Sequence, residues 1–339
     1  MMRKDLFLII LVLCVLFFPS CNPTKERLYK KSRIAMDTFI TITVESSSSR
    51  DAERAMDRAF AEIERLGTLF NYFSEDSEVS LINRFAGIRP VAVSGETADI
   101  IEKALSVSRE TDGAFDITIG PVMALWDFHN GTLPDERAIK ERLKLVGYRN
   151  MAVDTMKSTV FLKRKGMQID LGGVAKGYAA DRAVEILRKN GIQAGLVAVA
   201  GDIKAFGLKP DKSAWRVGIK NPRQEEDKNE IFATLQLFDK AISTSGDYER
   251  FFVKSGVRYH HLLDPKTGYP VYECRSVCVI AGEGVFTDAF STGLFVLGPR
   301  KGMELLNKLG FDGVIVDRSG AVSLTDGIKG NFELREKKS

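Results

Sequence analysis

The sequence predicts an α+β fold, a single domain in which mixed or antiparallel sheets pack against helices. Segments with the period of strands and segments with the period of helices do not alternate regularly, as a parallel βαβ series would require. Several strand-like segments also follow one another directly, as they do in hairpins. With 44% hydrophobic and 28% charged residues among 339, the chain has enough apolar material for a sizeable core.

The N-terminus predicts the cellular compartment. Two basic residues precede an apolar run over residues 6–18, which ends in Pro-Ser before Cys21. This pattern is typical of a lipoprotein signal peptide. The run is shorter than the about 20 residues that a spanning helix needs, although an uncleaved anchor helix is the alternative. We therefore expect residues 1–20 to be removed, Cys21 to be lipidated, and the mature protein to be a membrane-anchored lipoprotein on the extracytoplasmic (periplasmic) side.

Composition places the folded domain at residues 34–330. The polar and basic residues of 21–33 predict a tether, and 331–339 predict a polar tail. Threonine alternates with apolar residues over 39–44, and this period of two is typical of a strand.

The helical segments follow this strand. Residues 50–71 give the clearest signal, because Ala55, Ala59, Ile63, Leu66 and Phe70 recur on one stripe of a helix. Glycine, which favours a helix C-cap, follows closely after three of the other segments. The other predicted helices span residues 95–111, 135–146, 174–190, 288–297 and 300–309.

Short segments rich in β-branched and other apolar residues predict further strands. They lie between the helical segments and not in one block, which again favours mixed layers. These predicted strands span residues 151–153, 159–162, 167–171, 196–199, 215–219, 231–238, 276–281 and 313–316.

Charge and cysteine content exclude some classes of partner. The net charge of +4 is small and spread along the chain, so a nucleic-acid partner is not indicated. Cys274 and Cys278 lie in one predicted strand, where their Cα atoms would be farther apart than the about 7 Å that a disulfide allows. We expect both to be free, buried thiols. No cysteine–histidine spacing predicts a zinc site.

The segment DLGGVAKG (170–177) predicts an anion site. A strand-like run ends at an acid, two glycines form a turn, and a helix begins. Free amides at a helix start attract phosphate, and glycines let it approach closely. Lys176 in the first turn opposes the helix dipole unless an anion lies there. An ordinary strand–turn–helix with a solvated lysine is the alternative, and the pattern is neither a P-loop nor a dinucleotide fingerprint.

The segment TDAFST (287–292) predicts a metal site. Thr287 suits a helix N-cap, and Asp288 and Thr292 share one face a turn apart. A carboxylate and a hydroxyl are oxygen ligands that suit Mg²⁺, which keeps phosphates and waters in its other positions. The alternative is an acid that only stabilises the helix start, with Thr292 bonded within its own helix.

The segment HLLDPKTG (261–268) places an imidazole near a carboxylate. His261 with Asp264 predicts an oriented base or a pocket wall, and a surface pair of His260 and His261 is the alternative. Together with the two preceding segments, this one favours a site for a diphosphate held with a divalent cation.

These segments, in this order, resemble the motifs of the ApbE family, FAD:protein FMN transferases that were once labelled thiamine-biosynthesis lipoproteins. The resemblance covers about residues 34–327. Its departures are slight, because only Asp37 and Ala200 stand where the family often has glycine. It includes the further segments MDTF (36–39), YFS (72–74), SEVSLIN (77–83), GAFDIT (113–118), GD (201–202) and STSG (243–246).

The resemblance implies a single α+β domain related to the tunnelling fold, with FAD between two halves. It also implies that His261 is a functional histidine and that Mg²⁺ is held by the Gly173 carbonyl, Asp288 and Thr292. His261 and Asp288 are alternative candidates for the group that takes the acceptor proton. The residues implied to line the FAD site are Met36, Tyr72, Ala114, Phe115, Asp116, Asp170, Lys176 and Leu262.

The implied activity is a Mg²⁺-dependent transfer of FMN from FAD to a threonine or serine of an acceptor protein, through a phosphoester and with release of AMP. The implied acceptors are subunits of sodium-pumping quinone reductases, Rnf-type complexes or other extracytoplasmic electron carriers. A Mg²⁺-dependent FAD pyrophosphatase and a non-catalytic FAD-binding lipoprotein are the alternatives.

Overall fold

The computed structural model describes residues 26–223 and 230–335. It confirms the predicted α+β fold: the main sheet has eight strands, each antiparallel to its neighbours. The strand order is β1-β2-β6-β7-β10-β13-β14-β15. The bounds are β1 Arg27–Ala35, β2 Thr38–Ser46, β6 Gly195–Val199, β7 Asp202–Phe206, β10 Ala241–Gly246, β13 Cys274–Ala281, β14 Asp312–Asp317 and β15 Val322–Leu324.

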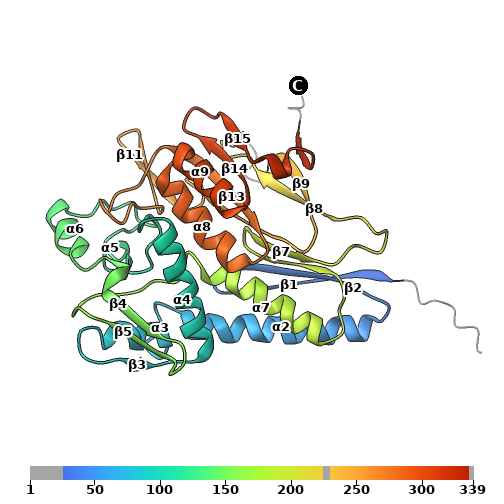
Figure 1. Ribbon diagram of the computed structural model, residues 1–339, viewed down its shortest axis with the longest axis horizontal. Coiled ribbons are helices and arrows are strands. Elements are labelled where there is room, and N and C mark those ends of the chain that lie inside the picture. Colours follow the sequence, from blue (N-terminus) through green and yellow to red (C-terminus); the bar gives the residue numbers. More distant parts are fainter. Residues whose placement is uncertain (1–25, 224–229, 336–339) are drawn as a thin grey trace, which may run out of the picture.

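Helices cover one face of this sheet (Figure 1). The apolar stripe predicted for residues 50–71 is confirmed, because all five of its residues are buried in the core. Helices α7 and α8 cross very closely: a Cβ on Gly177 would lie 2.0 Å from the Gly284 carbonyl oxygen. Only glycine at the crossing allows this approach. The helices are α2 Ser49–Phe70, α4 Gly95–Glu110, α7 Ala175–Lys189, α8 Gly284–Leu297 and α9 Pro299–Leu309.

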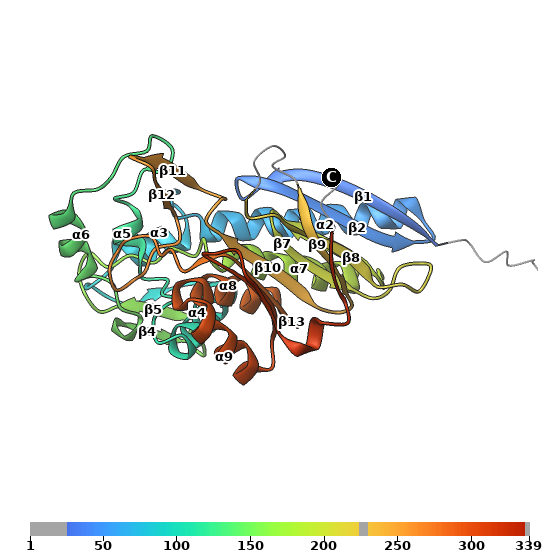
Figure 2. The same cartoon turned by 90° about the horizontal axis from the view of Figure 1, so that it is seen from above.

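A three-stranded sheet in the order β16-β9-β8 packs on the main sheet through a second core cluster. Its strands are β8 (Trp215–Lys220), β9 (Ile231–Leu237) and β16 (Phe332–Leu334). Buried and exposed residues alternate along β8, as expected for a strand with one face in the core. Figure 2 shows the β1–β2 hairpin along one edge of the main sheet.

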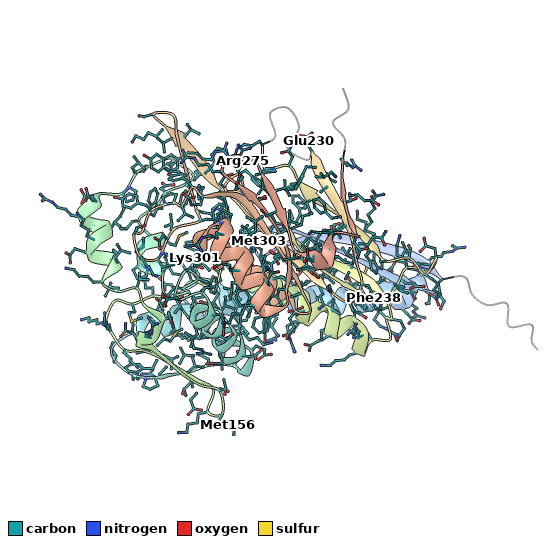
Figure 3. All side chains as sticks on the ribbon, turned by 45° about the horizontal axis from the view of Figure 1, so that its top comes forward. Met156, Glu230, Phe238, Arg275, Lys301 and Met303 are labelled. Atoms are coloured by element: carbon teal, nitrogen blue, oxygen red, sulfur yellow. The ribbon has the colours of Figure 1, made fainter. Side chains whose placement is uncertain are left out.

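The other half of the molecule is built from short elements (Figure 1). A second three-stranded sheet, β3-β5-β4, joins three short helices and a hairpin. In Figure 3, Met156 projects outward from the turn between β4 and β5. The elements are α3 Glu78–Arg84, β3 Val91–Ala92, α5 Gly120–Met123, α6 Glu136–Leu143, η1 Tyr148–Asn150, β4 Met151–Asp154, β5 Thr159–Leu162, β11 Phe251–Lys254 and β12 Val257–His260. The short helix η2 (Asp326–Ile328) lies against β14 of the main sheet instead.

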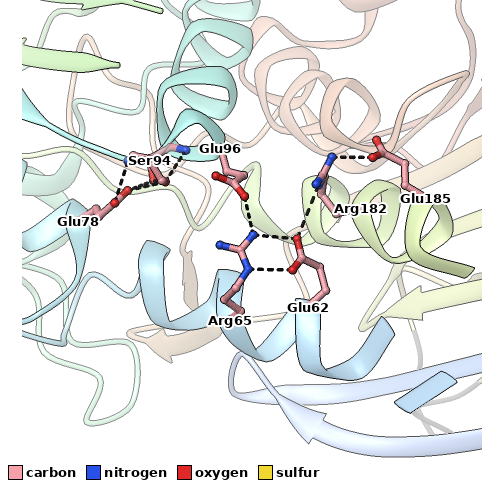
Figure 4. Close-up of polar contacts among 8 residues, drawn as sticks. Glu62, Arg65, Glu78, Ser94, Glu96, Arg182 and Glu185 are labelled. Atoms are coloured by element: carbon pink, nitrogen blue, oxygen red, sulfur yellow. Dashed lines mark hydrogen bonds and ion pairs between the residues drawn. The ribbon is translucent and has the colours of Figure 1, made fainter. Parts of the chain in front are cut away.

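An ion-pair network joins α2 to α4 and α7 (Figure 4). The Arg65 guanidinium donates to Glu62 at 2.8 Å and to Glu96 at 2.7 Å. Arg182 of α7 donates to Glu185 at 2.6 Å, and its Nε lies 3.8 Å from Glu62. A network of this kind orients helices more effectively than isolated surface pairs do.

Both ends of the domain extend beyond the predicted bounds. Residues 27–35, which fall mostly in the predicted tether, form strand β1 and pair with β2 along its whole length. Their basic side chains misled the prediction, because Lys31 and Arg33 bind Asp57 of α2. Phe332–Leu334, within the predicted tail, pairs with β9 as strand β16.

One predicted strand is absent from the described part of the chain. Residues 167–171 form only an isolated bridge, between Gln168 and Ile119. Their apolar side chains alternate into the core, which produced the strand-like pattern. The Asn83 side chain bonds the Ile169 amide and carbonyl in place of a neighbouring strand.

The predicted signal peptide and the lipidation site Cys21 lie outside the described residues. Within those residues, no helix is both long and apolar enough to cross a membrane. Cys274 and Cys278 are free and buried, as predicted.

Candidate functional site

Lys176 lies at the centre of a cluster of charges. Its ammonium is 2.9 Å from Asp202 Oδ2 and 3.8 Å from Asp288 Oδ1. Burial lowers the pKa of Lys176, but the two carboxylates more than offset this and raise its pKa above the usual range. Lys176 is therefore a charged side chain fixed by two carboxylates, and not a solvated lysine. The start of α7, the start of β7 and the first half of α8 meet at this point.

The Asp288 carboxylate caps α7. Its Oδ2 accepts the Gly177 N–H at 3.0 Å, and the Lys176 N–H also donates to this carboxylate. The amides of residues 172, 174 and 175 bond acceptors within their own turn. The sequence predicted free amides at this helix start that could bind phosphate. That prediction is wrong for these amides, because the Asp288 carboxylate already accepts those of residues 176 and 177.

Helix α8 begins earlier than predicted. The Asp181 carboxylate, from α7, accepts the Gly284 amide at 2.8 Å and the Val285 amide at 2.9 Å. This cap starts the helix at Gly284. The predicted N-cap role of Thr287 is wrong, since its hydroxyl donates to the Gly284 carbonyl at 2.9 Å inside the helix. The sequence did not indicate this cap, because the capping residue Asp181 belongs to another helix.

The three residues predicted to hold Mg²⁺ lie together. A Cβ on Gly173 would be 3.7 Å from Thr292 Oγ1 and 3.3 Å from the Phe115 ring. Asp288 and Thr292 are one turn apart on α8. The Thr292 hydroxyl also shares a hydrogen bond with Ser245 at 3.1 Å. The turn before α7 thus approaches α8 at the position of these two side chains.

This donor set fits a hard divalent cation. Burial, and then the charge of the neighbouring Asp202, raise the pKa of Asp288 to about 7, although Lys176 opposes this rise. A cation beside Asp288 would remove this cost. Carbonyl, carboxylate and hydroxyl oxygens are the ligands that Mg²⁺ takes. Among residues 26–223 and 230–335, no group of three or more His, Cys, Asp or Glu side chains is placed to hold a metal ion.

The loop with Ala114, Phe115 and Asp116 borders the same turn. Phe115 is buried and faces Gly173, as the preceding distance shows. The Asp116 carboxylate is used inside the chain: Oδ1 accepts the amide and hydroxyl of Thr118, at 2.8 and 2.6 Å, and Oδ2 accepts the Tyr148 amide at 2.8 Å. Asp116 therefore shapes the loop through its side chain.

Tyr72 and Asp170 are positioned by hydrogen bonds to neighbouring segments. The Tyr72 hydroxyl donates to Gln168 Oε1 at 2.8 Å, and the Asp170 amide donates to the Ile117 carbonyl at 2.8 Å. A cavity of about 580 Å³ opens beside Tyr72. Its lining residues are Tyr72, Phe73, Glu75, Ser80, Asn83, Arg84 and Gln168.

Met36 and Leu262 come from turns that follow strands. Met36 has a φ of 50° in the β1–β2 turn, and Gly67 of α2 makes room for it, since a Cβ there would lie 3.0 Å from Met36 Cγ. Leu262 is buried, and its amide donates to His260 Nδ1 at 3.3 Å. His260 Nε2 donates to the Val271 carbonyl at 2.8 Å. Both nitrogens of the His260 ring thus hold the local backbone.

His261 is oriented by the backbone. Its Nδ1 lies 3.3 Å from the Arg250 carbonyl oxygen, and its amide donates to the same oxygen at 3.1 Å. Because a carbonyl only accepts, Nδ1 carries the proton and Nε2 keeps its lone pair. Asp264 does not orient the ring, since its carboxylate accepts the Lys266 amide at 2.8 Å.

The pKa of His261 differs from the expected value. Burial, followed by the positive charge of Arg250, lowers the pKa of His261 to about 3. In the protein without substrate, the His261 ring is therefore neutral at neutral pH. A bound polyanion would raise the pKa again.

Sequence reasoning assigned no role to Asp202 or Ser245, although both lie in segments that carry the family resemblance. Asp202 binds Lys176, and Ser245 bonds Thr292. The Gly-Asp pair between two strands was the available signal for Asp202. The partners are far apart in the chain, so spacing gave no indication of the contact.

Known proteins resemble this chain over most of its length. The model of the ApbE family matches residues 36–315. A FAD:protein FMN transferase of Klebsiella pneumoniae (strain 342) is 35% identical over 286 residues, 84% of this chain and 87% of that protein. One from Treponema pallidum (strain Nichols) is 31% identical over 322 residues, 90% of this chain and 88% of that protein.

Solved structures of ApbE proteins are also similar to this chain. The crystal structure of the ApbE protein of Thermotoga maritima has a TM-score of 0.83 and 34% identity, covering 91% of this chain and all of that one (100%). That of the flavinyl transferase ApbE of Pseudomonas stutzeri has a TM-score of 0.79 and 28% identity, covering 90% of this chain and 97% of that one. The chain therefore belongs to the ApbE family.

Proposed function

We propose that this protein is a FAD:protein FMN transferase, which moves FMN from FAD to a threonine or serine hydroxyl of an acceptor protein and releases AMP. The observation that carries the proposal is the convergence of Lys176, Asp288 and Thr292 at the Gly173 turn. The ring of His261, fixed through Nδ1, adds a nitrogen with a free lone pair. The similar proteins from Klebsiella and Treponema bear the name of this activity.

The chain supplies the charge that such a reaction needs. Transfer to a hydroxyl depends on positioning and on stabilising negative charge at phosphorus. Lys176 is fixed by Asp202 at 2.9 Å, so its ammonium is held in place before the substrate arrives. We propose that Asp288, Thr292 and the Gly173 carbonyl hold Mg²⁺, which would neutralise diphosphate charge.

His261 is the candidate base. Its Nε2 carries a lone pair and its ring is fixed through Nδ1, so it can accept the proton of an acceptor hydroxyl. The negative charge of bound FAD would raise the pKa of His261 and make it a better base. Asp288 is less suited to this role, because its carboxylate is bonded to the start of α7.

One incubation tests the proposal. Purified protein is mixed with FAD, Mg²⁺ and an acceptor domain, and the products are separated under denaturing conditions. A fluorescent acceptor band, with AMP in solution, is the expected result. Free FMN without labelled acceptor would indicate a pyrophosphatase, and unchanged FAD would indicate a carrier. Either outcome contradicts the proposal. His261→Ala, assayed in parallel, controls for flavin that adheres without transfer.

We also propose that the protein is a lipoprotein anchored through Cys21 on the extracytoplasmic side of the membrane. The short apolar run before Cys21 supports this. Its expected acceptors are subunits of sodium-pumping quinone reductases, Rnf-type complexes or other electron carriers of that compartment. Cys21→Ala should leave the precursor unprocessed at this position and without lipid. A variant that still carries lipid at its mature N-terminus would contradict the assignment.

A further inference from the structure

We propose that Arg250 binds the FMN-side phosphate of FAD and stabilises the charge on it during transfer. This inference rests on the proposed function and adds a phosphate-binding residue to the site. Arg250 lies in the connection between β10 and β11, outside the segments that carry Lys176 and Asp288.

The backbone ties Arg250 to the candidate base. Its carbonyl oxygen accepts both the His261 amide, at 3.1 Å, and His261 Nδ1, at 3.3 Å. Any movement of this residue would therefore move the imidazole. The Arg250 backbone and the His261 ring are thus held together across the β11–β12 hairpin.

The Arg250 guanidinium also lies near Lys176. Its positive charge contributes to lowering the pKa of His261 and opposes the rise in the pKa of Lys176. Three basic groups thus gather at one side of the site.

Lys176 alone cannot neutralise the negative charge of a diphosphate. It is bound to Asp202 at 2.9 Å and lies 3.8 Å from Asp288. The amides at the start of α7 are bonded to Asp288 and to their own turn. The positive charge that remains for a diphosphate must come from other groups.

Arg250 differs from neighbouring arginines because its guanidinium is not bound to a carboxylate in the described part of the chain. Arg223 binds Asp247 through two bonds of 2.7 Å, and Arg258 lies 3.5 Å from the same carboxylate. Across residues 26–223 and 230–335, the Arg250 guanidinium has neither a hydrogen bond nor an ion pair, and its residue is exposed. An exposed guanidinium of this kind suits a phosphate, which it can bind through two parallel bonds.

The chemistry favours the FMN-side phosphate. The acceptor oxygen forms a bond to that phosphorus, the bridging P–O bond breaks, and the bridging oxygen leaves with AMP. The hydroxyl proton passes to His261 Nε2. Because the charge of Arg250 lies near both His261 and Lys176, we assign its guanidinium to the non-bridging oxygens of the attacked phosphorus, which gain charge during transfer.

Binding measurements test this without relying on turnover. The affinities of wild type, Arg250→Gln and Arg250→Lys are measured for FAD, FMN, AMP and riboflavin. Lys254→Gln, exposed on the adjoining β11–β12 hairpin, is the matched control for the loss of one positive charge. We expect Arg250→Gln to weaken FAD and FMN binding by about 10- to 100-fold and leave AMP and riboflavin unchanged. Arg250→Lys should lose less, and Lys254→Gln should match wild type.

Two results would overturn the inference. One is equal FAD affinity in Arg250→Gln and wild type; the other is a loss for AMP in place of FMN. The thermal midpoints of the two Arg250 variants should equal that of wild type, because the side chain has no bond to lose. A wild-type protein that binds FAD but labels no acceptor would contradict the proposed function instead, and the binding series would still decide the role of Arg250.

Discussion

Replacing Asp288 with asparagine separates the two roles of its carboxylate. The variant keeps a side-chain oxygen for the Gly177 amide, which lies 3.0 Å from Oδ2 in the wild type, but loses the negative charge. Lys176 keeps Asp202 at 2.9 Å, so no buried charge is left alone. We therefore expect Asp288→Asn to fold and to be at least as stable as wild type at about pH 8 in EDTA.

The pH dependence of this comparison follows from the raised pKa. The folded protein holds the Asp288 proton more tightly than the unfolded chain does, so this group's contribution to wild-type stability is present at low pH. It is lost as pH rises from about 4 to about 7. Asparagine does not titrate. The thermal midpoints of Asp288→Asn and wild type should therefore converge near pH 4.

The transfer rate should respond very differently. A cation site of this kind supplies several kcal/mol of transition-state stabilisation, and a loss of about 4 kcal/mol lowers the rate about 1000-fold. Asp288→Ala is the matched comparison. It also leaves the amides at the start of α7 without an acceptor, which costs about 1–3 kcal/mol of stability.

Stability is measured by thermal unfolding in EDTA and transfer by acceptor labelling in Mg²⁺. Both variants should lose transfer, and only the alanine variant should lose stability. An Asp288→Asn protein that labels the acceptor at a near-normal rate would refute the cation role. An Asp288→Asn protein that unfolds as easily as Asp288→Ala would contradict the second idea, that an acceptor oxygen without negative charge is enough to cap α7.

Three further substitutions give distinct results. His261→Ala should slow transfer by about 100-fold or more while FAD affinity, measured by titration, stays unchanged; unimpaired transfer would remove His261 as the base. Gly177→Ala should destabilise the protein by about 3 kcal/mol in urea unfolding, because its Cβ would lie 2.0 Å from the Gly284 carbonyl oxygen; a stable variant would show that the crossing of α7 and α8 can widen. Asp181→Ala should cost about 1–2 kcal/mol by removing the cap of α8, and an unchanged midpoint would show that the helix start needs no cap.

The sequence predicted those features that depend on local order. Helix α2 shows this best: its apolar stripe is a property of neighbouring residues, and the structure buries all five of its members. Strand β5 matches its predicted bounds, residues 159–162. Edge strands were harder to predict. The polar and basic side chains of β1 are compatible with either a tether or an exposed strand. Only the pairing with β2, which the folded chain shows, distinguishes the two.

The candidate site was predicted as a set of residues but not as a set of contacts. Gly173, Asp288 and Thr292 do lie together. Spacing could not show that Asp288 caps α7 or that Asp181 caps α8, because each bond crosses between two helices. The lowered pKa of His261 depends on burial and on Arg250, which only the folded chain brings near.

The central claim is that FMN leaves FAD for an acceptor hydroxyl. The most direct test is the ratio of AMP released to FMN bound covalently to the acceptor, with the modified residue identified by mass spectrometry. We predict one AMP for each FMN attached, on a threonine or serine, and no product from an acceptor in which that residue is alanine. Release of AMP with free FMN and an unmodified acceptor would contradict the account.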